Sequence, residues 1–173
     1  MSTVVVVGVD HSLQNLESFC RTTEDKESKN QQREALKDRL QELIIANRVE
    51  LVAEEARPDS PCLGKLLADS HACRYCDLTM PHRERERRGI KQDYNKAAET
   101  QKVAYGILEG FMFEVVQENR QEAKSILIIC GSRHAKNVAQ LFLTAGDEVI
   151  VEDTTSAPWY QARWPFLRSM HTY

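Results

Sequence analysis

The chain has 173 residues, of which 42% are hydrophobic and 28% are charged, and its formal net charge is −3. This length suits one domain that is large enough to bury a substantial core. The small negative charge argues against nucleic acid as the main partner, because nucleic-acid binding normally calls for a marked basic excess. No apolar run approaches the roughly 20 residues that cross a bilayer. We therefore expect neither a nucleic-acid nor a membrane partner.

The first apolar stretch predicts a strand and not a signal peptide. Val4 to Val7 begins almost at Met1, with no basic segment before it and no cleavage site after it. The chain has five cysteines, an odd number. Reduced thiols in the cytoplasm are the simpler interpretation of such a set, so we expect a cytoplasmic protein.

Apolar spacing predicts alternating strands and helices in the first half of the chain. A strand over 3–9 leads into Gly8-Val9-Asp10-His11, and a long polar connection over 12–30 follows it. The first clear helix covers 31–48, because its leucines recur at helical spacing. The second strand, 49–53, ends in Glu54-Glu55.

Shorter elements follow the second strand. Pro61 opens a short helix over 62–70, and a weak strand over 74–79 carries Asp77 near its end. Residues 83–88 predict an exposed helical turn that Gly89 closes, with Glu84 paired to Arg88. The alternative is that the arginines of this run bind an anionic substrate. A long helix is expected over 93–122.

The stretch from Ser125 to His134 organises the second half. Ile126 to Cys130 are five apolar residues in a row, too few for a helix core but suited to a strand buried on both faces. Gly131 ends the run, and a helix is expected over 135–145 before a fifth strand over 148–152. His134 is thus predicted where a strand leads into a helix.

This order of elements predicts an α/β fold: a three-layer sandwich around a mainly parallel sheet of about five strands with right-handed crossovers. We expect residues 1–152 to form a single α/β domain. Residues 153–173 form an aromatic tail with both tryptophans. The tail is predicted to pack on the body or on a second subunit, the latter giving a homodimer.

Polar residues follow the predicted strands. Because the carboxyl ends of parallel strands meet at one edge of a sheet, these side chains should converge. Two imidazoles with carboxylates are a ligand set for a divalent ion such as Mn, Zn, Co or Fe, and such an ion lowers the pKa of bound water to about 7 in favourable sites. If the second strand alternates, only one of its two glutamates faces the site. The converging residues are His11, Glu54, Glu55, Asp77, His134 and Asp153.

Three segments together resemble one protein family: Gly8-Val9-Asp10-His11, the acidic pair Glu54-Glu55, and Gly131-Ser132-Arg133-His134. They resemble the TraB/TIKI group, whose wider relatives include erythromycin-esterase-like and haem-binding ChaN-like proteins. The resemblance implies two Gly-x-x-His motifs and a glutamate around one site. It implies a metal-dependent hydrolase or, in the esterase branch, a histidine general base without metal. The chain is shorter than most members, and the arginine of the family corresponds to Arg83, Arg87 or Arg133.

Two functional hypotheses from different classes follow. In the first, His11, His134 and Glu54 or Glu55 hold a metal ion or activate water, while Asp77 and an arginine such as Arg133 orient a small-molecule or peptide substrate. In the second, the chain is a non-catalytic module for a small anion or phosphate ligand. Residues 131–134 would then bind the anion at a helix N-terminus, with Lys136 nearby.

A second cluster contains Cys73 and Cys76 in a Cys-x-x-Cys spacing, which is half of a zinc knuckle. The other half would have to come from Cys62, His71 or His82, at irregular spacing. A redox role needs a helix N-terminus that lowers the thiol pKa, whereas this pair enters a predicted strand. The role of the pair stays open at this point.

Overall fold

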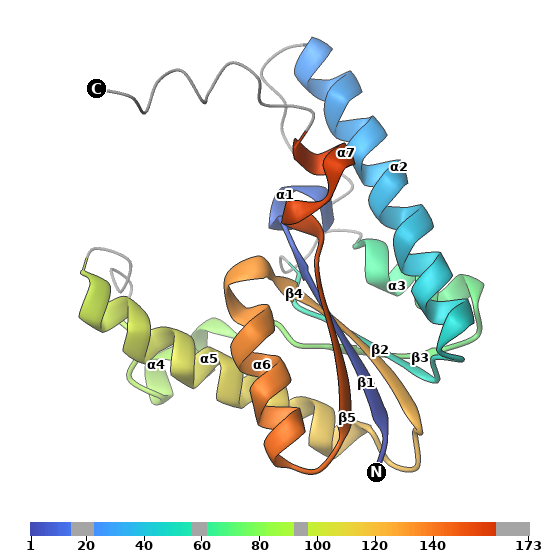
Figure 1. Cartoon of the computed structure of the whole chain (residues 1–173). Helices are drawn as coiled ribbons and strands as arrows, with labels where there is room; N and C mark the ends of the chain where they lie inside the picture. Colours follow the sequence, from blue (N-terminus) through green and yellow to red (C-terminus); the bar gives the residue numbers. More distant parts are fainter. Residues whose placement is uncertain (15–22, 57–61, 92–96, 162–173) are drawn as a thin grey trace.

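The computed structural model describes residues 1–14, 23–56, 62–91 and 97–161 (Figure 1). All strand pairs in its five-stranded sheet are parallel, and the strand order is β3-β2-β4-β1-β5. This confirms the predicted α/β fold with a parallel sheet of about five strands. The elements are β1 (Thr3–Val9), α1 (His11–Gln14), α2 (Thr23–Ala46), β2 (Leu51–Glu54), α3 (Leu63–Ser70), β3 (Arg74–Asp77), α4 (His82–Arg87), α5 (Ala98–Asn119), β4 (Ser125–Gly131), α6 (Ser132–Thr144), β5 (Glu148–Asp153), the 3₁₀ helix η2 (Thr154–Ser156) and α7 (Pro158–Gln161).

The two most apolar strands, β1 and β4, lie side by side in the sheet. Their register pairs Val6 with Ile128, and both side chains are fully buried. Successive side chains alternate between the two faces: Val4 and Val6 contribute to one hydrophobic cluster, and Val5 contributes to the other. Burying each such aliphatic side chain contributes about 1.5–3 kcal/mol, which explains why these two strands form the middle of the molecule.

Helices cover both faces of the sheet, and the molecule is a three-layer sandwich (Figure 1). The helices α2 and α3 pack against one face, and α5 and α6 against the other. Their contacts come from apolar stripes at helical spacing. The buried contacts include Leu36 and Leu40 of α2, Leu63 and Leu67 of α3, Met112 and Val116 of α5, and Val138 and Phe142 of α6.

Two predicted helix starts are wrong, one of them by two turns. The helix α2 begins at Thr23 instead of residue 31, so the second half of the expected polar connection is helical. Its first turns extend beyond the edge of the sheet (Figure 1) and need no apolar stripe, which is why periodicity missed them. The helix α6 begins at Ser132, so His134 lies in its first turn.

The predicted tail begins inside β5, which ends at Asp153, and continues through η2 and α7. The start of this segment packs on the body, because the Tyr160 carbonyl accepts a hydrogen bond from Gln32 Nε2 at 3.0 Å. Residues 162–173 lie outside the described part of the chain, and a contact of the tail with a second subunit stays a prediction. None of the helices that the structure describes is both long and apolar enough to cross a membrane.

The connections after β1 and β4 leave the sheet on opposite faces. From β1 the chain continues into α1 and α2 on one face, whereas β4 continues directly into α6 on the other (Figure 1). Where neighbouring parallel strands feed helices on opposite faces, their carboxyl ends open a crevice. Both Gly-x-x-His motifs therefore lie at the same edge of the sheet, as predicted.

Candidate functional site

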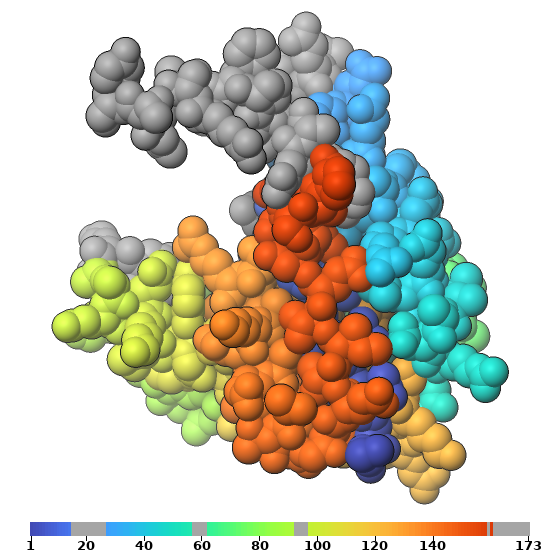
Figure 2. Space-filling model, in the orientation of Figure 1, coloured from blue at the N-terminus to red at the C-terminus, as the bar shows by residue number. Residues whose placement is uncertain are grey.

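A cleft of about 890 Å³ opens at the carboxyl ends of β1, β2 and β4. Figure 2 shows the surface hollowed between the yellow-to-orange α5 and α6 and the red α7. The cleft brings together residues from both ends of the chain. Its lining includes Asp10, His11, Glu55, Tyr105, Arg133 and His134.

One wall of the cleft carries a buried histidine–glutamate pair. His134 Nδ1 lies 3.0 Å from Glu109 Oε1 of α5, and only 8% and 6% of the two side chains are exposed. Because a carboxylate only accepts, the Nδ1–H donates, and Nε2 is left as the basic nitrogen. Asn137 Nδ2 donates to both oxygens of Glu109 and fixes the carboxylate. The edge of the Tyr105 ring packs against the imidazole, with centroids 4.6 Å apart.

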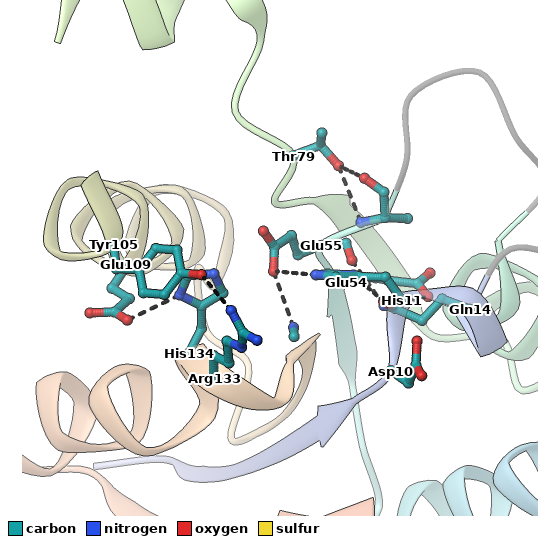
Figure 3. Close-up of polar contacts among 12 residues, drawn as sticks. Asp10, His11, Gln14, Glu54, Glu55, Thr79, Tyr105, Glu109, Arg133 and His134 are labelled. Atoms are coloured by element: carbon teal, nitrogen blue, oxygen red, sulfur yellow. Dashed lines mark hydrogen bonds and ion pairs between the residues drawn. The ribbon is translucent and has the colours of Figure 1, made fainter. Parts of the chain in front are cut away.

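The opposite wall carries the second histidine. His11 Nδ1 donates to Gln14 Oε1 at 2.6 Å, and His11 Nε2 lies 3.6 Å from Glu55 Oε2. The buried Gln14 amide donates in turn to Glu54 Oε1 and to the Glu55 carbonyl, which ties the imidazole to the end of β2. Figure 3 shows the two groups facing each other: Tyr105, Glu109, Arg133 and His134 on one side, and His11, Gln14, Glu54 and Glu55 on the other.

The two motif glycines permit close approach between parts of the protein itself. A Cβ on Gly8 would lie 3.0 Å from both the Ser132 Cα and the Ala135 Cβ of α6. A Cβ on Gly131 would lie 2.6 Å from His11 Nε2. The motifs thus interlock: each glycine makes room for the segment that follows the other strand.

Of the two glutamates at the end of β2, only Glu55 faces the cleft. Its Oε2 accepts a hydrogen bond from Gly131 N at 3.1 Å and also lies beside His11. Glu54 is fully buried, with Oε2 directed at Gly64 of α3. Burial raises the pKa of Glu54, and the Cys62 thiol and the Gly64 N–H offset only part of that effect. Alternation along the strand therefore selects Glu55 as the site residue.

Asp77 does not line the cleft. It is exposed at the end of β3, where its Oδ1 accepts a hydrogen bond from Thr79 N and closes a local turn. Among the three arginines considered from the family resemblance, only Arg133 lines the cleft. Arg87 instead pairs with Glu84 on the surface of α4, and Arg83 is exposed outside the cleft.

A further carboxylate, Asp10, connects two segments that line the outer part of the cleft. Burial alone would raise the pKa of Asp10, but hydrogen bonds from Ser12 N and from the Tyr160 hydroxyl outweigh it and lower the pKa below its usual value. The Tyr160 hydroxyl lies 2.8 Å from Asp10 Oδ2. This contact connects the loop after β1 to α7 and keeps Asp10 ionised.

The structure does not gather the predicted metal ligands around one point, and a bound metal ion stays a prediction. Glu54 is directed away from the cleft, and His134 Nδ1 is bonded to Glu109, so only its Nε2 could bind a metal ion. Within residues 1–14, 23–56, 62–91 and 97–161, no three His, Cys, Asp or Glu side chains are grouped so that they could hold one ion. The same holds for a zinc knuckle: Cys73 packs with the cluster on one face of the sheet, and Cys76 lies in the cluster on the other.

Sequence reasoning missed three residues of the site: Gln14, Tyr105 and Glu109. Glu109 had a usable signal. It directly follows Leu108 and precedes Met112 by three positions, so helical periodicity places its carboxylate on the buried side of α5. A charge in that position requires a partner, but the sequence alone does not show that the partner is His134.

The two Gly-x-x-His segments and Glu55 meet at one cleft, and the resemblance to the TraB/TIKI group stays a prediction. The chemistry of the cleft follows from its own side chains: two imidazoles, each tied at Nδ1, and a carboxylate between the two strand ends. No family model, no curated protein and no solved structure matches this chain.

Proposed function

We propose that the protein is a hydrolase in which His134 acts as general base, oriented by Glu109, in the cleft at the carboxyl ends of β1, β2 and β4. The observation that carries the proposal is the 3.0 Å contact between His134 Nδ1 and Glu109 Oε1, made by two buried side chains at the wall of an open cleft. A carboxylate in this position fixes the histidine tautomer and stabilises the imidazolium that forms when a proton is taken up.

The proposed reaction is the hydrolysis of an ester. His134 Nε2 takes a proton from water, and the hydroxide attacks the electrophilic centre of the substrate. The bond to the leaving alcohol then breaks, and the alcohol takes a proton from a protonated histidine. We assign that donor role to His11, which lines the cleft and whose Nε2 lies 3.6 Å from Glu55 Oε2. Water and ester are consumed, and acid and alcohol are released.

A non-catalytic module for a small anion is the second candidate. It is favoured by the position of Arg133, whose guanidinium lies at the mouth of the cleft and donates to the Tyr105 hydroxyl at 3.3 Å. Binding of the anion by the backbone amide of Gly131, at the start of α6, is less favoured, because Gly131 N already donates to Glu55. This candidate predicts binding of an anion without turnover.

Turnover of chromogenic esters tests the proposal. We expect the wild type to hydrolyse at least one member of a panel of p-nitrophenyl carboxylate and phosphate esters, and His134→Asn to lower kcat by about 10²–10⁴-fold, the usual contribution of a positioned general base. Glu109→Gln should lower kcat with little change in KM, because it acts on the transition state through His134. The control is His82→Gln, an exposed histidine of α4 outside the cleft.

Two results would overturn the proposal: no turnover above background with any ester, or turnover that survives His134→Asn. Treatment with a chelator separates the two chemistries implied by the family resemblance. Full activity after chelation is expected for a histidine base. Loss of activity that added Mn²⁺ or Zn²⁺ restores would instead establish the metal-dependent hydrolase predicted from the sequence.

A further inference from the structure

We infer that the substrate carries an anionic group, a carboxylate or a phosphate, which Arg85 and Arg133 bind in the same cleft. The inference rests on the proposed function, because it names the substrate class of that site. Arg85 comes from α4 and Arg133 from α6, and both line the cleft that holds the two histidines. Arginine presents a planar fork of donors that matches carboxylate and phosphate oxygens.

The charges of these two cleft arginines are not compensated by a carboxylate. Neither has a carboxylate within ion-pair distance in the part of the chain that the structure describes. Arg85 Nε donates to the Met80 carbonyl, and Arg133 donates to the Tyr105 hydroxyl. By contrast, the arginines that pair with glutamate or aspartate are Arg39, Arg87, Arg88 and Arg120.

The contrast is sharpest within α4. Arg87 and Arg88 both bind Glu84 of the same helix, whereas Arg85 is half-buried at the cleft. The bond from Arg85 Nε to the Met80 carbonyl anchors the guanidinium and leaves its two terminal nitrogens to donate elsewhere. A half-buried charge without a counter-ion is costly, and an anionic ligand would supply the missing charge.

The two carboxylates that line the cleft, Asp10 and Glu55, lie against the opposite wall and are already engaged, while Glu109 on the side of His134 is buried and does not line it. Asp10 accepts from Ser12 N and from the Tyr160 hydroxyl, and Glu55 accepts from Gly131 N beside His11. The arginines stand instead with Gln101 and Tyr105 along α4, α5 and α6. The positive charges of the arginines and the negative charges of Asp10 and Glu55 thus lie on different walls of the cleft. An anionic substrate would bind on the side of the arginines, which is also the side of His134.

Binding of inorganic phosphate tests the inference without turnover. We expect phosphate to raise the melting temperature of the wild type, and Arg85→Gln or Arg133→Gln to weaken the apparent affinity by about tenfold or more, the usual effect of losing a hydrogen bond to a charged group. Arg87→Gln is the matched control, since it removes the same charge from the same helix outside the cleft. Equal effects of Arg85→Gln and Arg87→Gln would overturn the inference.

Kinetics with paired esters separate this inference from the proposed function. We expect kcat/KM for an ester with a free carboxylate or phosphate to exceed that of its neutral analogue, and the ratio to fall at least tenfold in Arg85→Gln and Arg133→Gln. No preference for the anionic ester would overturn the inference and leave a hydrolase in place. His134→Asn should lower kcat as stated above and still bind phosphate, so loss of phosphate binding in that variant would contradict a separate anion subsite.

Discussion

Glu54 and Glu55 are neighbours in sequence with opposite surroundings. Glu55 meets the cleft and receives the Gly131 N–H, whereas Glu54 is enclosed beneath α3 and has a raised pKa because of its burial. The sequence could say that one of the two faces the site, but not which one. The choice depends on the side to which the last residue of β2 points, and thus on a strand boundary that apolar patterning does not locate to one residue.

Glu54→Gln should change how stability depends on pH. In the unfolded chain a glutamate ionises at about pH 4.3, whereas in the fold the pKa of Glu54 is raised. Between these two values the folded chain retains a proton that the unfolded chain releases. The contribution of Glu54 to the free energy of unfolding is therefore fully present below the unfolded-state pKa. It is lost as the pH rises through the raised pKa of the folded state. Glutamine has no such proton, so the stability of the variant relative to wild type should increase with pH across this window.

Urea unfolding at several pH values between 4 and 8 measures this change. The exposed Glu118→Gln on α5 removes the same charge outside the core and is the control. A difference between Glu54→Gln and wild type that stays constant over the whole range would mean that Glu54 is not the group responsible.

Contacts between elements explain why the two Gly-x-x-His motifs work as a pair. The end of β1 packs against the first turn of α6 through Gly8, and the end of β4 makes room for His11 through Gly131. The motif spacing predicted that both strands end at one sheet edge, and the adjacent pairing of β1 with β4 confirms it. The interlock could not be predicted, since it depends on the distance between α6 and β1.

Substituting alanine for each of the two glycines should have different effects: one variant should lose stability and the other should lose activity. A Cβ at Gly8 meets the Ser132 backbone and Ala135, which cannot move without shifting α6, so Gly8→Ala should lower the free energy of unfolding by about 1–3 kcal/mol. A Cβ at Gly131 meets the end of the His11 ring, which can rotate away. Gly131→Ala should therefore leave stability nearly unchanged and lower ester turnover by displacing His11.

Urea unfolding and ester turnover, measured on both variants, test this distinction. Two findings would contradict it: Gly131→Ala as unstable as Gly8→Ala, or Gly131→Ala with wild-type turnover.

At the scale of the whole molecule, the sheet has a protected centre and two edges. The strands β1 and β4 each have a neighbour on both sides, whereas β3 and β5 are the outermost strands. The exposed side chains of β5 include Ile150 and Val151. The alternation of strands and helices predicted the three layers. Strands that are apolar on both faces form the central sheet, and helices with one apolar stripe cover it. It did not predict the strand order, which depends on long-range pairing.

Rates of amide hydrogen exchange should differ between the central strands and the edge strands. We expect the slowest amides in β1 and β4, whose backbone groups are paired on both sides, and faster exchange along the outer edge of β5. Mass spectrometry of peptic fragments measures the difference. If the amides of β5 exchanged as slowly as those of β4, the outer edge of β5 could not be unpaired. Such a result would indicate that a second copy of the chain pairs there, in line with the homodimer that was one of the two predictions.

The adjacent pairing of β1 with β4 has a consequence for the making of this protein. During synthesis the ribosome releases His11 more than a hundred residues before His134, and β1 has neither of its final neighbours at that stage. A nascent chain therefore cannot carry a complete pair of imidazoles until β4 and the start of α6 have emerged. If the proposed hydrolase mechanism holds, ester turnover requires both imidazoles and would therefore report completed assembly of the domain. A chain truncated before β4 should then show no turnover.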